Sequence, residues 1–150
     1  EWADAQAALD NVTASDAATP QGAEGKTALS IAVQALSGEI AVRRGEVDAA
    51  ITHFQEAVKI EDAGLYFEPP KWYYPVRHSL GAALMKAGRS ADAETVYRED
   101  LRRFPENGWA LFGLAQALRA QGKKDEATAT EARFRKAWPD TDVTLTASRF

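Results

Sequence analysis

Five pairs of identical residues in the second half of this chain are each separated by 34 positions. The pairs keep the same order in both copies and combine small, apolar and helix-breaking residues: Leu80 and Leu114, Leu84 and Leu118, Gly88 and Gly122, Ala93 and Ala127, and Pro105 and Pro139. A repeat of this length is typical of paired antiparallel helices. Because one pair cannot bury its apolar face alone, such pairs stack on one another. The period therefore predicts an all-α repeat fold with an extended surface suited to binding.

Apolar residues recur every three or four positions over most of the chain, which is the spacing of one helix face. A stripe that includes Ile31 and Ala35 predicts a helix from about residue 23 to Arg44. Further helices are predicted over five ranges: 46–60, 73–87, 90–104, 107–121 and 123–138. Glycines suited to the left-handed conformation that ends a helix follow three of these segments: Gly45, Gly88 and Gly122.

Different segments flank this pattern at both ends. Residues 1–22 predict a short leading helix and then a polar loop rich in Asp, Asn, Thr, Ser, Pro and Gly. We expect residues 23–140 to form one repeat domain. Residues 141–150 are expected to form a C-terminal cap or tail, either a short helix or an extended segment. Because the chain starts at Glu1 without an initiator Met, we expect it to be a piece of a longer protein.

The composition narrows the class of protein. Of the 150 residues, 45% are hydrophobic and 27% are charged, as in soluble globular domains. No run approaches the roughly 18 apolar residues of a membrane helix, so we expect no membrane insertion. The absence of Cys excludes disulfides and thiolate metal sites and leaves the compartment open. A net charge of −4 argues against a nucleic-acid partner. Residues 1–64 carry −7 and residues 65–150 carry +3, which fits either head-to-tail self-association or unevenly charged solvated faces.

The repeated residues resemble the tetratricopeptide repeat (TPR) family, whose units carry small residues at positions 8 and 20, an aromatic at 24 and Pro at 32. The resemblance gives units of about 31–64, 74–107 and 108–141, with an insert over about 63–73. It implies a right-handed solenoid of three antiparallel helix pairs with extra terminal helices. Six residues depart from the pattern where apolar, small or aromatic side chains are usual: Gln34, Ser37, Arg77, Asp100, Glu131 and Phe134.

The insert is rich in aromatic residues and contains two prolines, which prevent a helix from continuing through it. The run Glu68-Pro69-Pro70-Lys71-Trp72-Tyr73-Tyr74-Pro75 resembles the C-terminal part of bacterial TPR proteins of unsettled function. Its aromatic side chains form either a second recognition surface or a cluster that packs the loop onto its scaffold. They are Phe67, Trp72, Tyr73 and Tyr74.

The resemblance also implies a binding groove, because the first helix of each TPR unit lines a concave face that takes protein or peptide partners. Transferred to this chain, the groove positions name nine candidates: Glu39, Arg43, His78, Met85, Lys86, Trp109, Phe112, Gln116 and Arg119. Exposed aromatic residues beside Arg and Gln suit peptide capture. Trp109 and Phe112 are therefore either anchors for a peptide or side chains covered by the insert or the C-terminal tail.

No pattern predicts a catalytic or metal site. His53 and His78 stand on separate units without clustered carboxylates, and no Ser-His-Asp set or glycine-rich phosphate loop stands out. We expect a non-catalytic scaffold or adaptor without cofactor, which binds a protein or peptide through the groove. Two alternatives remain, namely a structural or self-association segment of a longer repeat protein and an accessory domain that holds a small ligand.

Overall fold

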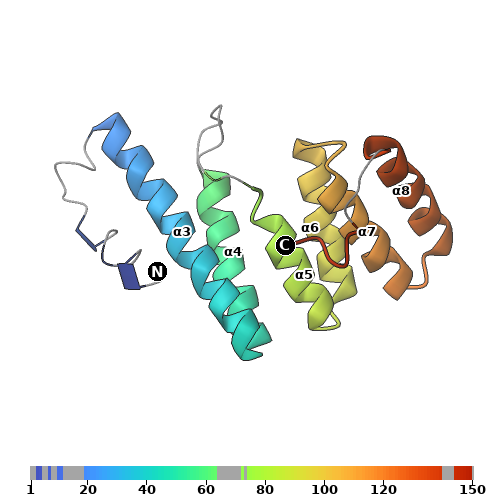
Figure 1. Cartoon of the computed structure of the whole chain (residues 1–150), viewed down its shortest axis with the longest axis horizontal. Coiled ribbons are helices and arrows are strands. Elements are labelled where there is room, and N and C mark those ends of the chain that lie inside the picture. Colours follow the sequence, from blue (N-terminus) through green and yellow to red (C-terminus); the bar gives the residue numbers. More distant parts are fainter. Residues whose placement is uncertain are drawn as a thin grey trace. The chain divides into compact units, whose positions relative to one another are not determined.

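The computed structural model describes residues 3, 4, 7, 10, 11, 19–63, 72, 74–139 and 144–149. Contacts between residues divide the chain into two compact units, Glu1–Val76 and Arg77–Phe150. All regular structure in the described residues is α-helical (Figure 1), which confirms the predicted fold class. The boundary between the units falls inside the segment 23–140 that the sequence predicts as one domain.

The first unit is built on a helical hairpin of α3 (Pro20–Arg44) and α4 (Val47–Ala63). Helix α3 begins within the predicted polar loop, because Thr19 caps it through a hydrogen bond from the Gly22 N–H at 3.0 Å and Pro20 occupies its first turn. It ends at Gly45, which has a φ of 80°. Of the predicted leading helix, the described residues Ala3, Asp4, Ala7 and Asp10 are helical, and the others lie outside the described residues.

A close contact between the two helices holds this hairpin together. Gly38 of α3 faces Phe54 of α4, and a Cβ at Gly38 would lie 2.5 Å from the Phe54 ring. The phenyl ring therefore occupies the space that any larger residue at position 38 would need. Ala50 and Ala57 of α4 are also fully buried, so small residues bring the two backbones together along the hairpin.

The second unit contains four helices, α5 (Arg77–Lys86), α6 (Ser90–Arg103), α7 (Gly108–Ala120) and α8 (Lys124–Ala137). Each packs against the next one in the chain, and α5 also contacts α7 (Figure 1). Helix α5 starts four residues after the predicted start at 73, because proline at position 75 restricts the preceding residue away from helical angles. Gly88 and Gly122 have φ values of 74° and 76°, as predicted for residues that end helices.

Tyr97 of α6 determines how closely α5 and α7 approach each other. Its ring lies against Gly81 of α5 on one side and Gly113 of α7 on the other, and a Cβ at either glycine would overlap ring atoms. The ring is buried, as are Ala93 and Ala127, the small residues repeated with the period of 34. One aromatic side chain thus sits at the seam between α5 and α7.

The described C-terminal segment, residues 144–149, is not helical and packs onto the second unit. Ser148 is only 1% exposed. Its hydroxyl lies 2.5 Å from the Tyr97 hydroxyl and donates to the carbonyl oxygen of His78 at 3.0 Å. The predicted cap or tail is thus a non-helical segment anchored on α5 and α6.

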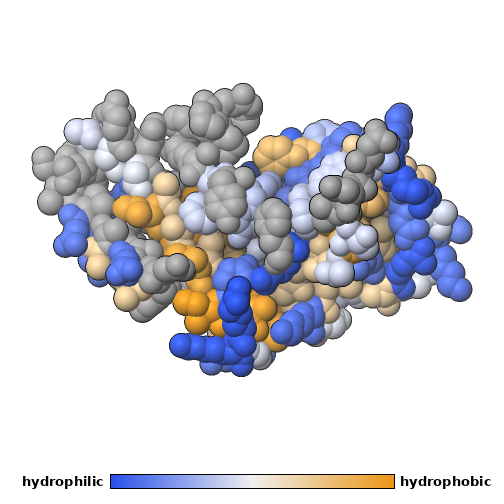
Figure 2. Space-filling view, in the orientation of Figure 1, coloured by the Kyte–Doolittle hydropathy of each residue, from blue (hydrophilic) through white to orange (hydrophobic). Residues whose placement is uncertain are grey.

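The outer surface at α8 is strongly polar in the space-filling view of Figure 2. The exposed residues of this helix include Lys124, Asp125, Arg133 and Lys136, in agreement with that view. No helix of the described residues combines the length and the apolar character needed to cross a lipid bilayer.

Candidate binding surface

The two aromatic residues favoured as peptide anchors pack against α8. Trp109 meets Trp138 edge to face, with ring centroids 5.7 Å apart and planes at 86°. The ring centroids of Phe112 and Phe134 are 5.8 Å apart, and those of Phe134 and Trp138 are 5.9 Å apart. We call these four side chains the α7/α8 aromatic cluster. Both predicted anchors are half-buried, and Phe134 of α8 and Trp138, which follows this helix, supply part of that burial.

His78 was expected to face a partner, and this prediction is wrong because its side chain is buried. The residue is 5% exposed, and its Nε2 lies 3.3 Å from Oδ2 of Asp100, which is fully buried. The Asn107 amide nitrogen lies 3.1 Å from the same Nε2. A single ring nitrogen donates to Asp100 or accepts from Asn107, and it cannot do both at once.

Asn107 also holds the start of α7 in place. Its Oδ1 accepts hydrogen bonds from the backbone N–H groups of Trp109 at 3.0 Å and Ala110 at 3.4 Å. An Asn at this position satisfies backbone groups that have no partner within the helix. Since the same side chain reaches His78, the beginnings of α5 and α7 are linked by one polar network.

The remaining candidates on this unit are at least partly accessible. Met85 and Gln116 are half-buried, and Lys86 is exposed. Arg119 pairs with Glu131 of α8 through two hydrogen bonds of 2.5 and 2.8 Å, and the pair lowers the pKa of the Glu131 carboxyl. Arg119 therefore contributes to the α7/α8 hairpin, whereas Met85, Lys86 and Gln116 form no hydrogen bond or ion pair with the other residues that the structure describes.

A buried carboxylate on α6 ties this helix to the turn after α7. Glu94 accepts hydrogen bonds from Lys123 at 2.6 Å, Gln121 at 2.7 Å and Arg98 at 2.8 Å. Its side chain is only 12% exposed. The hydrogen bond from Lys123, assisted by those of Arg98 and Gln121, lowers the pKa of Glu94 from 4.5 to about 2 although burial opposes the shift.

This network predicts a loss of stability in acid. Because the folded state holds Glu94 at the lower pKa, its contribution is fully present above pH 4.5 and disappears as the pH falls towards about 2. We expect Glu94→Gln to lower the free energy of unfolding by about 1 to 2 kcal/mol at pH 7, a value discounted for the exposed partners. The gap between the variant and the natural chain should close in urea titrations near pH 2.

Glu106→Gln is the matched control for this prediction. Glu106 pairs with Arg133 at 3.3 Å, but its side chain is 60% exposed. Solvent screens such a pair, so its removal should change the free energy of unfolding by less than about 0.5 kcal/mol at any pH. Equal effects of the two substitutions at pH 7 would contradict the role given to Glu94.

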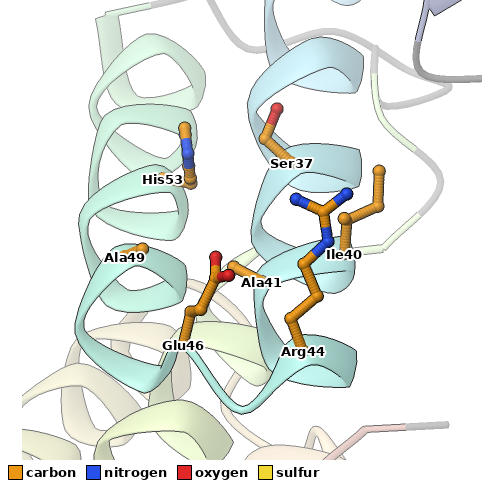
Figure 3. A pocket seen from close by; sticks show the side chains of 7 residues that line it. All are labelled: Ser37, Ile40, Ala41, Arg44, Glu46, Ala49 and His53. Carbon is orange, nitrogen blue, oxygen red and sulfur yellow. The ribbon is translucent and has the colours of Figure 1, made fainter.

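The candidates Glu39 and Arg43 belong to α3, in the first unit, where Glu39 is half-buried and Arg43 is exposed. Beside this helix face, the α3/α4 hairpin has an open hollow of about 250 Å³. Figure 3 shows Ile40 and Arg44 reaching it from α3 and His53 from α4. The His53 Nδ1 lies 2.8 Å from the Gln34 side-chain oxygen, so the ring is held in place across the hairpin.

Two residues of the predicted aromatic surface are described, and Phe67 and Tyr73 lie outside the described residues. The rings of Trp72 and Tyr74 are 6.2 Å apart, with their planes at 50°, and both residues are half-buried. This contact is compatible with either predicted role. Within the described part of the chain, no group of three or more His, Asp or Glu side chains is arranged to hold a metal ion.

Comparison with known families identifies the second unit. Residues 78–141 match the family model of the tetratricopeptide repeat. This part of the chain belongs to the tetratricopeptide repeat family. The matched segment contains nearly all of α5 and the whole of α6, α7 and α8, and it overlaps the predicted units 74–107 and 108–141. TPR segments generally mediate protein–protein interaction. No curated protein matches the chain significantly.

The predicted first TPR unit, 31–64, lies outside the matched residues and remains a prediction. One feature of the α3/α4 hairpin supports it. Gly38 and Phe54 are 16 positions apart and in contact, and Gly81 and Tyr97 of the TPR segment show the same spacing and the same contact. In each hairpin, an aromatic residue of the second helix fills the space above a glycine of the first helix.

Proposed function

We propose that this chain is a non-catalytic binding module that takes a protein or peptide on the face formed by α5 and α7. We call this surface the α5/α7 face and define it by Met85, Lys86 and Gln116. The observation that supports it is the position of Tyr97 between Gly81 and Gly113, which brings the first helices of two TPR pairs side by side. In this arrangement the exposed sides of two helices form one continuous surface.

The composition of the α5/α7 face suits a peptide that combines an apolar residue with charged or polar ones. Met85 offers an adaptable apolar contact, Lys86 a positive charge and Gln116 both a donor and an acceptor. The half-buried rings of Trp109 and Phe112 add apolar area at the edge towards α8. On the first unit, Glu39 and Arg43 are proposed as separate polar contacts of α3.

A selection from a displayed peptide library against the full chain tests this function. Binders should lose about tenfold or more in affinity when Met85→Glu and Gln116→Glu are combined, because two carboxylates would have to be desolvated on binding. Thr95→Glu on α6 and Thr128→Glu on α8 are matched controls, since both threonines are exposed. They should leave the affinity unchanged.

Two results would contradict the proposal in different ways. Binders that tolerate the double variant as well as the controls would show that the site lies on another surface. A selection that yields no specific peptide would argue against a binding module altogether. Circular dichroism of each variant should show unchanged helix content, which ties a change in affinity to the altered surface.

A further inference from the structure

The C-terminal segment 144–149 is bound to the TPR unit as a ligand would be. Ser148 lies 51 residues from Tyr97 and 70 residues from His78 in the sequence, yet its hydroxyl contacts both. The rest of the segment alternates, since Thr144 and Thr146 are exposed and Leu145 and Ala147 are half-buried. The segment bends at residues 146–148, so it lies on the unit as an irregular segment.

The hydrogen bonds of Ser148 restrict which side chains can occupy this position. The His78 carbonyl oxygen can only accept, so the serine O–H must donate to it. The remaining lone pairs of the serine oxygen then accept from the Tyr97 hydroxyl. The site therefore requires a small group that donates and accepts at the same time, which among side chains means the hydroxyl of Ser or Thr.

The same contacts place this subsite at the seam of the proposed binding surface. His78 belongs to the first turn of α5, and the Tyr97 ring that reaches Ser148 is held between Gly81 of α5 and Gly113 of α7. In Figure 1 the C-terminal segment runs from the side of α7 and ends in front of α5. The segment thus covers part of the seam between the two helices that would bind a partner.

We infer that residues 144–149 are an internal ligand of the α5/α7 face, and that the external partner is a peptide that presents Ser or Thr to Tyr97 and to the His78 carbonyl. This inference rests on the proposed function. A partner must displace the tail, so its apparent affinity is reduced by the fraction of molecules in which the face is open. Release of the tail should therefore strengthen binding.

The test uses the full chain and a labelled peptide with the sequence of residues 140–150. Ser148→Glu in the chain removes the donor, and it would bury a carboxylate at the seam, so it should release the tail. We expect the peptide to bind this variant at least about tenfold more tightly than the natural chain. The peptide with Ser148→Glu should not bind either chain. Thr146→Glu in the chain is the control, because Thr146 is exposed, and it should leave binding unchanged.

A second variant tests the subsite without placing a charge in it. Tyr97→Phe keeps the ring between the glycines and removes only the hydroxyl. We expect faster hydrogen exchange at residues 144–149 and weaker binding of the peptide, with the helices still protected. Unchanged exchange in this variant, or no gain in peptide binding by the folded Ser148→Glu chain, would overturn the inference. So would cooperative unfolding of the Ser148→Glu chain, because the tail would then be an integral part of the core.

The library selection separates this inference from the proposed function. Binders without Ser or Thr that use the α5/α7 face, and that bind the natural and Ser148→Glu chains equally well, would retain the function and reject the internal ligand. Binders that carry Ser or Thr and favour the Ser148→Glu chain would support both. Light scattering gives a further outcome. If the natural chain had twice its expected mass and the Ser148→Glu chain did not, the tail would bind a second copy, and the internal ligand would be rejected.

Discussion

Replacing His78 with Leu is expected to lower the free energy of unfolding by about 3 to 5 kcal/mol. Asp100 is fully buried, and its Oδ2 lies 3.3 Å from the His78 ring. Among the described residues, its other carboxylate oxygen has no hydrogen-bond partner. Without His78, the carboxyl group would remain in the core with neither solvent nor its histidine partner. Urea unfolding of the two chains at one pH measures the loss.

The second histidine of the chain provides the control for this experiment. His53 is half-buried and bonded to the neutral side chain of Gln34 at 2.8 Å. Replacing it with Leu should cost only about 0.5 to 1.5 kcal/mol, the usual contribution of one hydrogen bond. Adding Asp100→Ala to the His78→Leu chain should recover much of the lost stability, because it removes the buried carboxyl group that lost its histidine partner. A double variant as unstable as the sum of the single changes would contradict this explanation.

Adding a single methyl group at Gly81 should also lower the free energy of unfolding. Its carbon would overlap the Tyr97 ring, which cannot move away because Gly113 of α7 lies on its other side and Ser148 binds its hydroxyl. We expect Gly81→Ala to lower the free energy of unfolding by about 3 kcal/mol, the upper end of the usual cost of overpacking. Thermal and urea unfolding of the variant measure the effect.

The same substitution at Gly25 should have the opposite effect on stability. Gly25 lies within α3, and a Cβ there would have no atom within 4 Å. The change should stabilise the helix by up to about 1 kcal/mol, because alanine restricts the unfolded chain and favours the helix. In a Tyr97→Leu background, Gly81→Ala should cost much less than in the natural chain. Similar costs in both backgrounds would show that the ring is not the obstacle.

The helices of the TPR unit could be predicted because the residues that end them and the apolar period that defines them are short-range features of the sequence. Gly88 and Gly122 adopt the left-handed conformation, and the apolar residues between them repeat with the helical period. Each of these features acts within a few residues along the chain. The start of α3 was placed three residues too late, since the composition of the loop concealed a Thr-Pro pair that begins a helix.

The contacts of the candidate site depend on residues far apart in sequence, which periodicity does not reveal. The departures from the repeat pattern were nevertheless informative. Asp100 stands where a small residue is usual and meets His78, Glu131 replaces an aromatic residue and pairs with Arg119, and Phe134 packs on Phe112. Each of these three residues has its partner on the preceding helix. No comparable departure marks Ser148, because it lies beyond the last repeat.

Two different parts of Tyr97 determine the spacing of the helices and the choice of ligand. The ring, held between Gly81 and Gly113, determines the spacing of two helices. The hydroxyl, which reaches Ser148, determines what can dock at that seam. A change between Tyr and Phe would alter the hydroxyl and leave the ring in place. Related chains could thus acquire a preference for different ligands by the gain or loss of one oxygen atom, with no change in architecture.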